Sequence, residues 1–65
     1  MTRRYEVVPF QKDWQVRFGD IQMAAFTERD PAVRDGRALA EANRPSVLVV
    51  RDQDGNVESE ETFDA

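Results

Sequence analysis

The chain has 65 residues, a net charge of −4, and neither cysteine nor histidine. Its length allows one small domain, predicted over residues 1–65, near the lower limit for folding without disulfides or metals. The missing cysteines exclude disulfides and thiolate sites, and the missing histidines remove the commonest general base and transition-metal ligand. We therefore expect no enzyme, no cofactor, no bound metal and no small-molecule substrate.

Three segments near the N-terminus carry the alternating apolar pattern of half-buried strands. Residues 5–10 place Tyr5 and Val7 on one face, and residues 14–18 are apolar at every second position. Residues 21–25 continue the alternation after a Gly-Asp turn. The apolar face of this third segment is predicted to consist of Ile21, Met23 and Ala25.

A helix is predicted next. Asp30-Pro31 marks its start, because Asp accepts hydrogen bonds from the free amides of a first turn and Pro suits the first helical position. Pro45 stops it after about Asn43, which is a reasonable cap. Its apolar stripe consists mostly of small residues, which lets the helix lie close to a sheet. The stripe comprises Ala32, Val33, Gly36, Leu39 and Ala40.

The last third of the chain predicts a hairpin. Residues 47–51 are apolar on both faces, as in an interior strand, and Asp54-Gly55 supplies a tight turn. Residues 57–63 form the last strand, and the acidic strand and tail over 58–65 would protect an edge from pairing with another chain. The predicted fold is α+β, of order ββ(β)-α-ββ. It has a mainly antiparallel sheet of four or five strands with one helix packed on one face.

Four pieces of this pattern, at matching spacing, resemble the small prokaryotic family called domain of unknown function 2188. They are Tyr5-Glu6-Val7-Val8-Pro9, Trp14-Gln15-Val16, the helix with Ala32-Val33, Arg37 and Leu39-Ala40, and Leu48-Val49-Val50 followed by Asp54-Gly55-Asn56-Val57. The resemblance covers nearly the whole chain and implies a stand-alone domain without a known activity. Similar sequences often carry histidine where this chain has Glu6 and Arg51. The threonine that commonly caps the family's helix aligns with Glu28, which moves the expected cap to Thr27 or Asp30.

Two local hypotheses concern charged residues. Asp52, Asp54 and Asn56 alternate as calcium ligands do, but a calcium loop needs glycine where this chain has Val57 and an acid where it has Phe63. A plain hairpin turn is therefore the preferred interpretation. Glu6 and Arg51 would form a cross-strand ion pair if the first and fourth strands are neighbours.

The favoured functional hypothesis is a non-catalytic protein-interaction module. One helix covers only one face of a sheet, so apolar side chains on the other face would mark a protein partner or a homodimer. This module would self-associate or dock through the uncovered sheet face. The candidate interaction surface comprises Val8, Phe10, Phe26, Leu48 and Val50.

The alternative is a nucleic-acid-associated accessory protein that uses basic side chains on the sheet. Its candidate residues are Arg3, Arg4, Lys12, Arg17 and Arg51. The net charge disfavours it, because residues 52–65 hold six acids and no base and would be repelled by phosphates.

Location and habitat are predicted from composition alone. The chain contains no apolar run of the roughly 20 residues that cross a bilayer, and its N-terminus lacks the apolar core of a signal peptide. We expect a cytoplasmic protein without membrane contact. The bases comprise eight arginines and one lysine. This bias fits either a GC-rich genome or adaptation to a salty cytoplasm.

Overall fold

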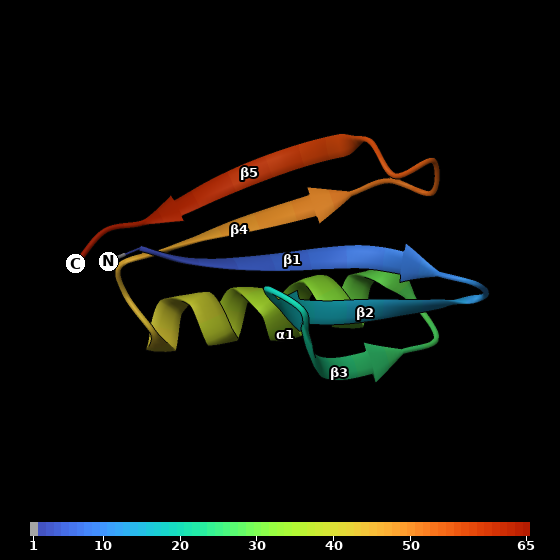
Figure 1. Cartoon of the computed structure of the whole chain (residues 1–65), viewed down its shortest axis with the longest axis horizontal. Coiled ribbons are helices and arrows are strands. Elements are labelled where there is room, and N and C mark those ends of the chain that lie inside the picture. Colours follow the sequence, from blue (N-terminus) through green and yellow to red (C-terminus); the bar gives the residue numbers. More distant parts are fainter. Residues whose placement is uncertain (1) are drawn as a thin grey trace.

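In the part of the chain that the structure describes, five strands form one mixed sheet, and a single helix covers one of its faces (Figure 1). The structure is a computed structural model that describes residues 2–65. Its elements are β1 (Arg3–Phe10), β2 (Asp13–Phe18), β3 (Ile21–Phe26), α1 (Arg29–Ala42), β4 (Ser46–Arg51) and β5 (Val57–Phe63). The strand order is β3-β2-β1-β4-β5. The predicted α+β class and element order are confirmed.

One pair of strands departs from the antiparallel pattern. β1 and β4 run parallel, with Tyr5 opposite Leu48 and Val7 opposite Val50, whereas the other three pairs are antiparallel. The parallel pair follows from the connection between them, since β2, β3 and α1 carry the chain back to the starting end of the sheet. β4 is interior, as predicted, and β5 is an edge strand.

The helix lies close to the sheet because its buried stripe is made of small residues. Ala32, Gly36 and Ala40 are all buried, as the sequence predicts. A Cβ atom added at Gly36 would lie 3.0 Å from both Leu48 Cδ1 and Val7 Cγ2. Large side chains from the sheet thus fill the space that larger helix residues would need.

The two ends of α1 differ in how they are capped. Asn43 occupies the C-cap, where its backbone N–H donates to Ala40 O at 3.2 Å and its Nδ2 donates to Leu39 O at 2.8 Å, as predicted. At the other end Glu28 is the N-cap and makes no side-chain capping bond. The prediction of a cap at Thr27 or Asp30 is wrong. Because the helix begins at Arg29, Asp30 lies in the first turn and acts there as an acidic residue near the positive helix end.

A bulge in β3 reverses its side-chain alternation. Val16 of β2 pairs with Ala24 and Arg17 pairs with Gln22, so Met23 has no partner. Ala24 and Phe26 consequently pack against the core, while Met23 is exposed. The predicted inward face of this strand is therefore wrong, since one extra residue shifts every later side chain to the other face.

The β4–β5 turn uses its first aspartate as a structural acceptor. Asp52 Oδ1 accepts hydrogen bonds from the backbone N–H groups of Asp54 and Asn56, at 2.9 and 3.0 Å. Gly55 has a positive φ of 86°, and its N–H donates to Asp52 O at 3.0 Å. The segment is thus a hairpin turn of the kind its Asp-Gly sequence predicts.

Candidate interaction surfaces

The predicted interaction surface is divided between the two faces of the sheet. Leu48 and Val50 are 1% and 3% exposed and belong to the core beneath α1. Their predicted place on the uncovered face is wrong, because they share the face of Tyr5 and Val7, which lie opposite them on β1. Phe26 packs against the same core through the β3 bulge. Of the predicted surface, Val8 and Phe10 remain on the uncovered face.

The centre of the uncovered face is an ion-paired network. Arg51 Nε donates to Glu6 Oε1 at 2.9 Å, and Arg4 Nε donates to Glu6 Oε2 at 3.4 Å. The predicted Glu6–Arg51 pair is therefore confirmed. Val49 lies opposite Glu6 in the register and is fully buried although it points away from the helix. The long charged side chains around it shield this valine from water.

The network controls the ionisation of its one acid. Partial burial raises the pKa of Glu6, but the hydrogen bonds and positive charges of Arg51 and Arg4 outweigh that effect and lower the pKa below its ordinary value. Glu6 is thus a carboxylate at neutral pH, and it neutralises part of the positive charge on this face.

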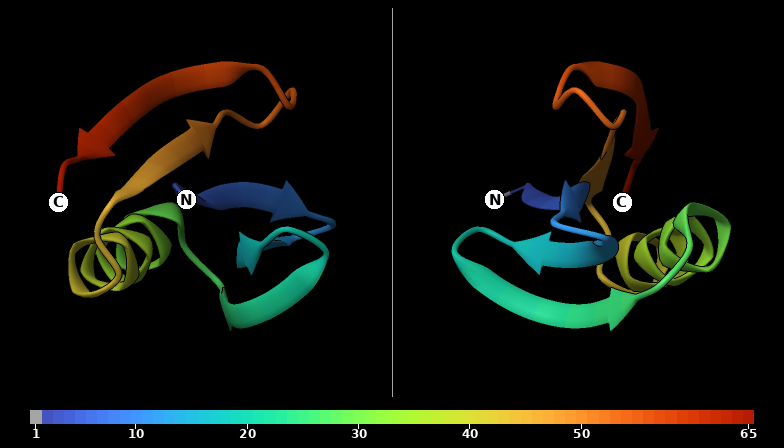
Figure 2. Two further views of the ribbon diagram at one scale, coloured as in Figure 1. Left: turned by 60° about the vertical axis from the view of Figure 1, so that its left-hand side comes forward. Right: turned by 90° about the vertical axis from the view of Figure 1, so that its right-hand side faces the viewer.

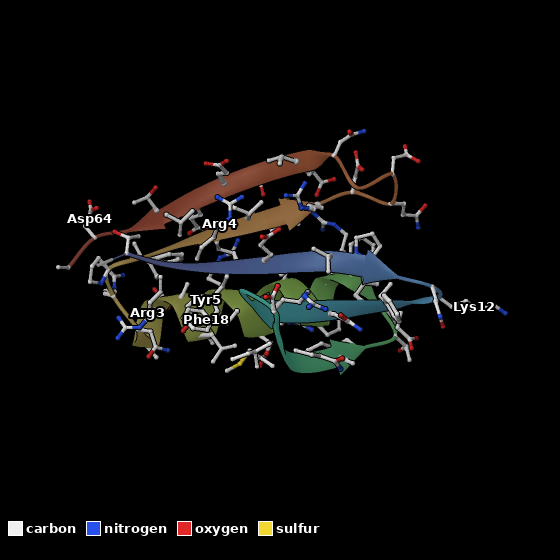
Figure 3. The ribbon with its side chains drawn as sticks, viewed as in Figure 1. Arg3, Arg4, Tyr5, Lys12, Phe18 and Asp64 are labelled. Atoms are coloured by element: carbon white, nitrogen blue, oxygen red, sulfur yellow. The ribbon has the colours of Figure 1, made fainter. Side chains whose placement is uncertain are left out.

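The predicted basic surface is also divided. Arg4, Arg17 and Arg51 share the uncovered face, and Arg17 donates to Gln15 Oε1 at 2.9 Å. Arg3 instead lies beside the end of α1, where it donates to Asn43 O at 3.5 Å. Lys12 projects from the β1–β2 turn at the opposite end of the molecule (Figure 3). The arginines on this face are held by neighbouring side chains.

β3 and β5 lie at opposite edges of the sheet (Figure 2), and their side chains differ sharply in chemistry. β3 has the sequence Ile-Gln-Met-Ala-Ala-Phe, without a charge, and exposes Ile21 by 59% and Met23 by 46%. β5 carries three glutamates among seven residues, and two of them, Glu58 and Glu61, pair with arginines of α1. β5 is thus an acidic edge strand, as predicted, whereas the β3 edge carries no charge.

The sequence interpretation missed the β3 edge. The alternation placed Met23 inward, and only the bulge brings it to the surface. One signal was available: residues 21–26 are free of charge in a chain of which 34% is charged. An uncharged, mostly apolar segment in such a chain indicates either core or an exposed apolar surface.

An open hollow lies at the end of the sheet where the β4–β5 turn meets the start of α1. Its volume is about 570 Å³, and Trp14 and Arg29 form part of its wall together with acidic residues. Within residues 2–65, no group of three or more acidic side chains is arranged to hold a metal ion. The carboxylate of Asp52 is already engaged by its own turn.

Comparison with known proteins identifies the family. Residues 5–63 match the family described as an uncharacterized protein conserved in bacteria (DUF2188). The chain belongs to this family. It is also similar to the uncharacterized protein YycD of Bacillus subtilis (strain 168), with 32% identity over 66 residues that cover 97% of this chain and all of YycD. No solved structure matches the chain. The resemblance drawn from four short motifs is thus confirmed for this DUF2188 member.

Across residues 2–65, no helix is both long and apolar enough to cross a membrane.

Proposed function

We propose that this DUF2188 protein is a non-catalytic interaction module that binds a protein partner by adding a strand to its sheet at β3. The observation that carries the proposal is the contrast between an uncharged, apolar, unpaired edge at β3 and an acidic edge at β5. This proposal moves the predicted interaction surface from the uncovered face of the sheet to the edge of the sheet. The move follows from the burial of Leu48 and Val50 and from the ion-paired centre of that face.

An edge strand presents a row of backbone N–H and C=O groups that can pair with another extended chain. Charged side chains on the edge oppose such pairing, and β3 has none. Ile21 and Met23 add apolar surface on which the side chains of an incoming strand can pack. Phe10 is 52% exposed and extends the apolar surface of the sheet elsewhere, at the end of β1.

The test is a comparison of two lysine variants. Met23→Lys places a charge on β3, and Val57→Lys places the same charge on β5, where the native side chain is 49% exposed against 46% for Met23. Proteins captured by the immobilised wild-type chain through β3 should be lost with Met23→Lys and retained with Val57→Lys. The proposal is contradicted if no protein, a second copy included, depends on β3 for its retention.

The alternative role in nucleic-acid association has one supporting observation, the presence of Arg4, Arg17 and Arg51 on one face. Glu6 pairs with two of these arginines, which weakens the field that a phosphate backbone would meet. A gel shift with single- and double-stranded DNA and RNA at low salt tests this role. Retardation that is abolished in an Arg4→Gln/Arg17→Gln/Arg51→Gln variant would favour it over the interaction module.

A further inference from the structure

We infer that the strand which pairs with β3 is β3 of a second copy, in an antiparallel arrangement about a twofold axis that joins two sheets into one. This inference rests on the proposed function and names the partner. It requires that two identical edges be compatible in charge, in length and in side-chain character.

Charge favours this arrangement over a pairing of two copies through β5. The net charge of −4 makes two copies repel, and six of the 13 acids lie within residues 52–65. β5 and β3 are at opposite ends of the strand order β3-β2-β1-β4-β5. Pairing through β3 therefore puts the two acidic edges at the far margins of the joined sheet, where their repulsion is weakest.

Side-chain character favours a copy of β3 as the incoming strand. When β3 pairs antiparallel with itself over its full length, each residue lies opposite an uncharged residue, since all six are uncharged. Cross-strand neighbours then include the exposed Ile21 and Met23 of both copies together with small alanines. The two strands also match in length, so no backbone group of a longer strand is left over.

The arrangement stops at two copies. A twofold axis uses the same edge of each chain, so the interface is closed. The edges that remain are the two β5 strands, and both carry glutamates that oppose pairing. One strand pair buries less surface than a standard protein interface, so we expect a dissociation constant of roughly 10–500 μM.

Sedimentation equilibrium of the full chain, from about 10 μM to about 1 mM, tests the inference by mass action. Wild type should shift from monomer to dimer without larger species. Met23→Lys should raise the dissociation constant at least about tenfold, because each copy then brings a charged side chain into a strand pair that is otherwise uncharged. Val57→Lys is the matched control: it adds the same charge on the other edge and should dimerise like wild type. Far-ultraviolet circular dichroism on all three proteins verifies that each is folded.

Salt distinguishes this dimer from one held by ion pairs. Raising the ionic strength screens the repulsion between the two acidic chains, so wild-type dimerisation should strengthen. Weakening by salt would indicate an interface made of ion pairs and would overturn the inference.

The outcomes also separate this inference from the proposed function. A wild type that is monomeric at about 1 mM, while Met23→Lys still loses a captured protein, overturns the dimer and leaves the interaction module standing. A monomer that captures nothing through β3 overturns both. A dimer that Phe10→Ser disrupts and Met23→Lys does not would move the interface to the open face of the sheet and would overturn the β3 pairing.

Discussion

The two edge strands of this small sheet both place side chains in the same core, but the side chains that they expose to solvent are acidic on β5 and uncharged on β3. β5 is anchored by Phe63, which is 5% exposed, and presents three glutamates outward. β3 is anchored by Ala24 and Phe26 and presents Ile21 and Met23 without a charge nearby on the strand. The difference teaches that strand position alone does not decide whether an edge pairs. We expect the side chains on the edge to decide it, because they set the charge that an incoming strand meets.

The largest expected effect comes from removing the anchor of the charged edge. Phe63→Ala should lower the free energy of unfolding by about 3 kcal/mol, since Phe63 is buried beside Ser46 of β4. The equivalent change at the other edge, Phe26→Ala, should lower it by about half as much, because Phe26 is only partly buried. Urea unfolding of both variants measures the contrast. Equal losses would mean that the two edges are anchored alike.

The next largest loss of stability is expected where α1 packs against the sheet. Gly36→Ala should destabilise the protein by about 2 kcal/mol, because the added methyl group lies 3.0 Å from Leu48 Cδ1 and Val7 Cγ2. Ala38→Gly on the exposed side of α1 is the control for helix propensity and should cost about 1 kcal/mol. Thermal unfolding should rank the two variants in that order. A stabilised Gly36→Ala protein would contradict the close packing on which both edges depend.

The ion-paired centre of the open face predicts a pH dependence. The pKa of Glu6 is lowered by folding, so the folded state binds fewer protons and this pair stabilises the protein above the ordinary pKa of glutamate. The contribution is lost as the pH falls through the lowered pKa. Between about pH 7 and about pH 3, Glu6→Gln should lose less stability than wild type, by at most about 1 kcal/mol. Parallel unfolding curves for the two proteins across that range would contradict the role of Glu6.

Removing the glutamates of β5 should have the smallest effect on stability and the largest effect on the size of the oligomer. Glu58→Gln/Glu60→Gln/Glu61→Gln removes exposed charges and two ion pairs with α1, which should change stability by about 1 kcal/mol or less. It also makes β5 resemble β3 in charge. A chain with two pairing edges should form species larger than a dimer, visible by light scattering. A variant that associates no further than wild type would mean that charge is not what protects β5.

Much of this fold could be predicted because its signals are local. The alternation of Tyr5 and Val7, the small-residue stripe around Gly36, and the Asp54-Gly55 turn each predict the element that forms. The Glu6–Arg51 pair could be predicted too, once the two strands were supposed to be neighbours.

The rest depends on contacts between distant segments. The bulge at Met23 arises from the pairing of β3 with β2, and no pattern within residues 21–26 predicts it. The side of the sheet on which Leu48 and Val50 lie depends on the parallel register with β1, which alternation cannot fix when a strand is apolar on both faces. For these two reasons the sequence predicts Leu48, Val50 and Phe26 on the wrong face of the sheet.

Amide hydrogen exchange, compared at about 20 μM and about 1 mM protein, tests the central claim most directly, because it reports on both edges in one experiment. Amides of β3 (Ile21–Phe26) should become more protected at the higher concentration, while those of β5 (Val57–Phe63) should exchange at the same rates. Protection that rises in β5, or rates in β3 that do not depend on concentration, would contradict the claim that β3 is the pairing edge.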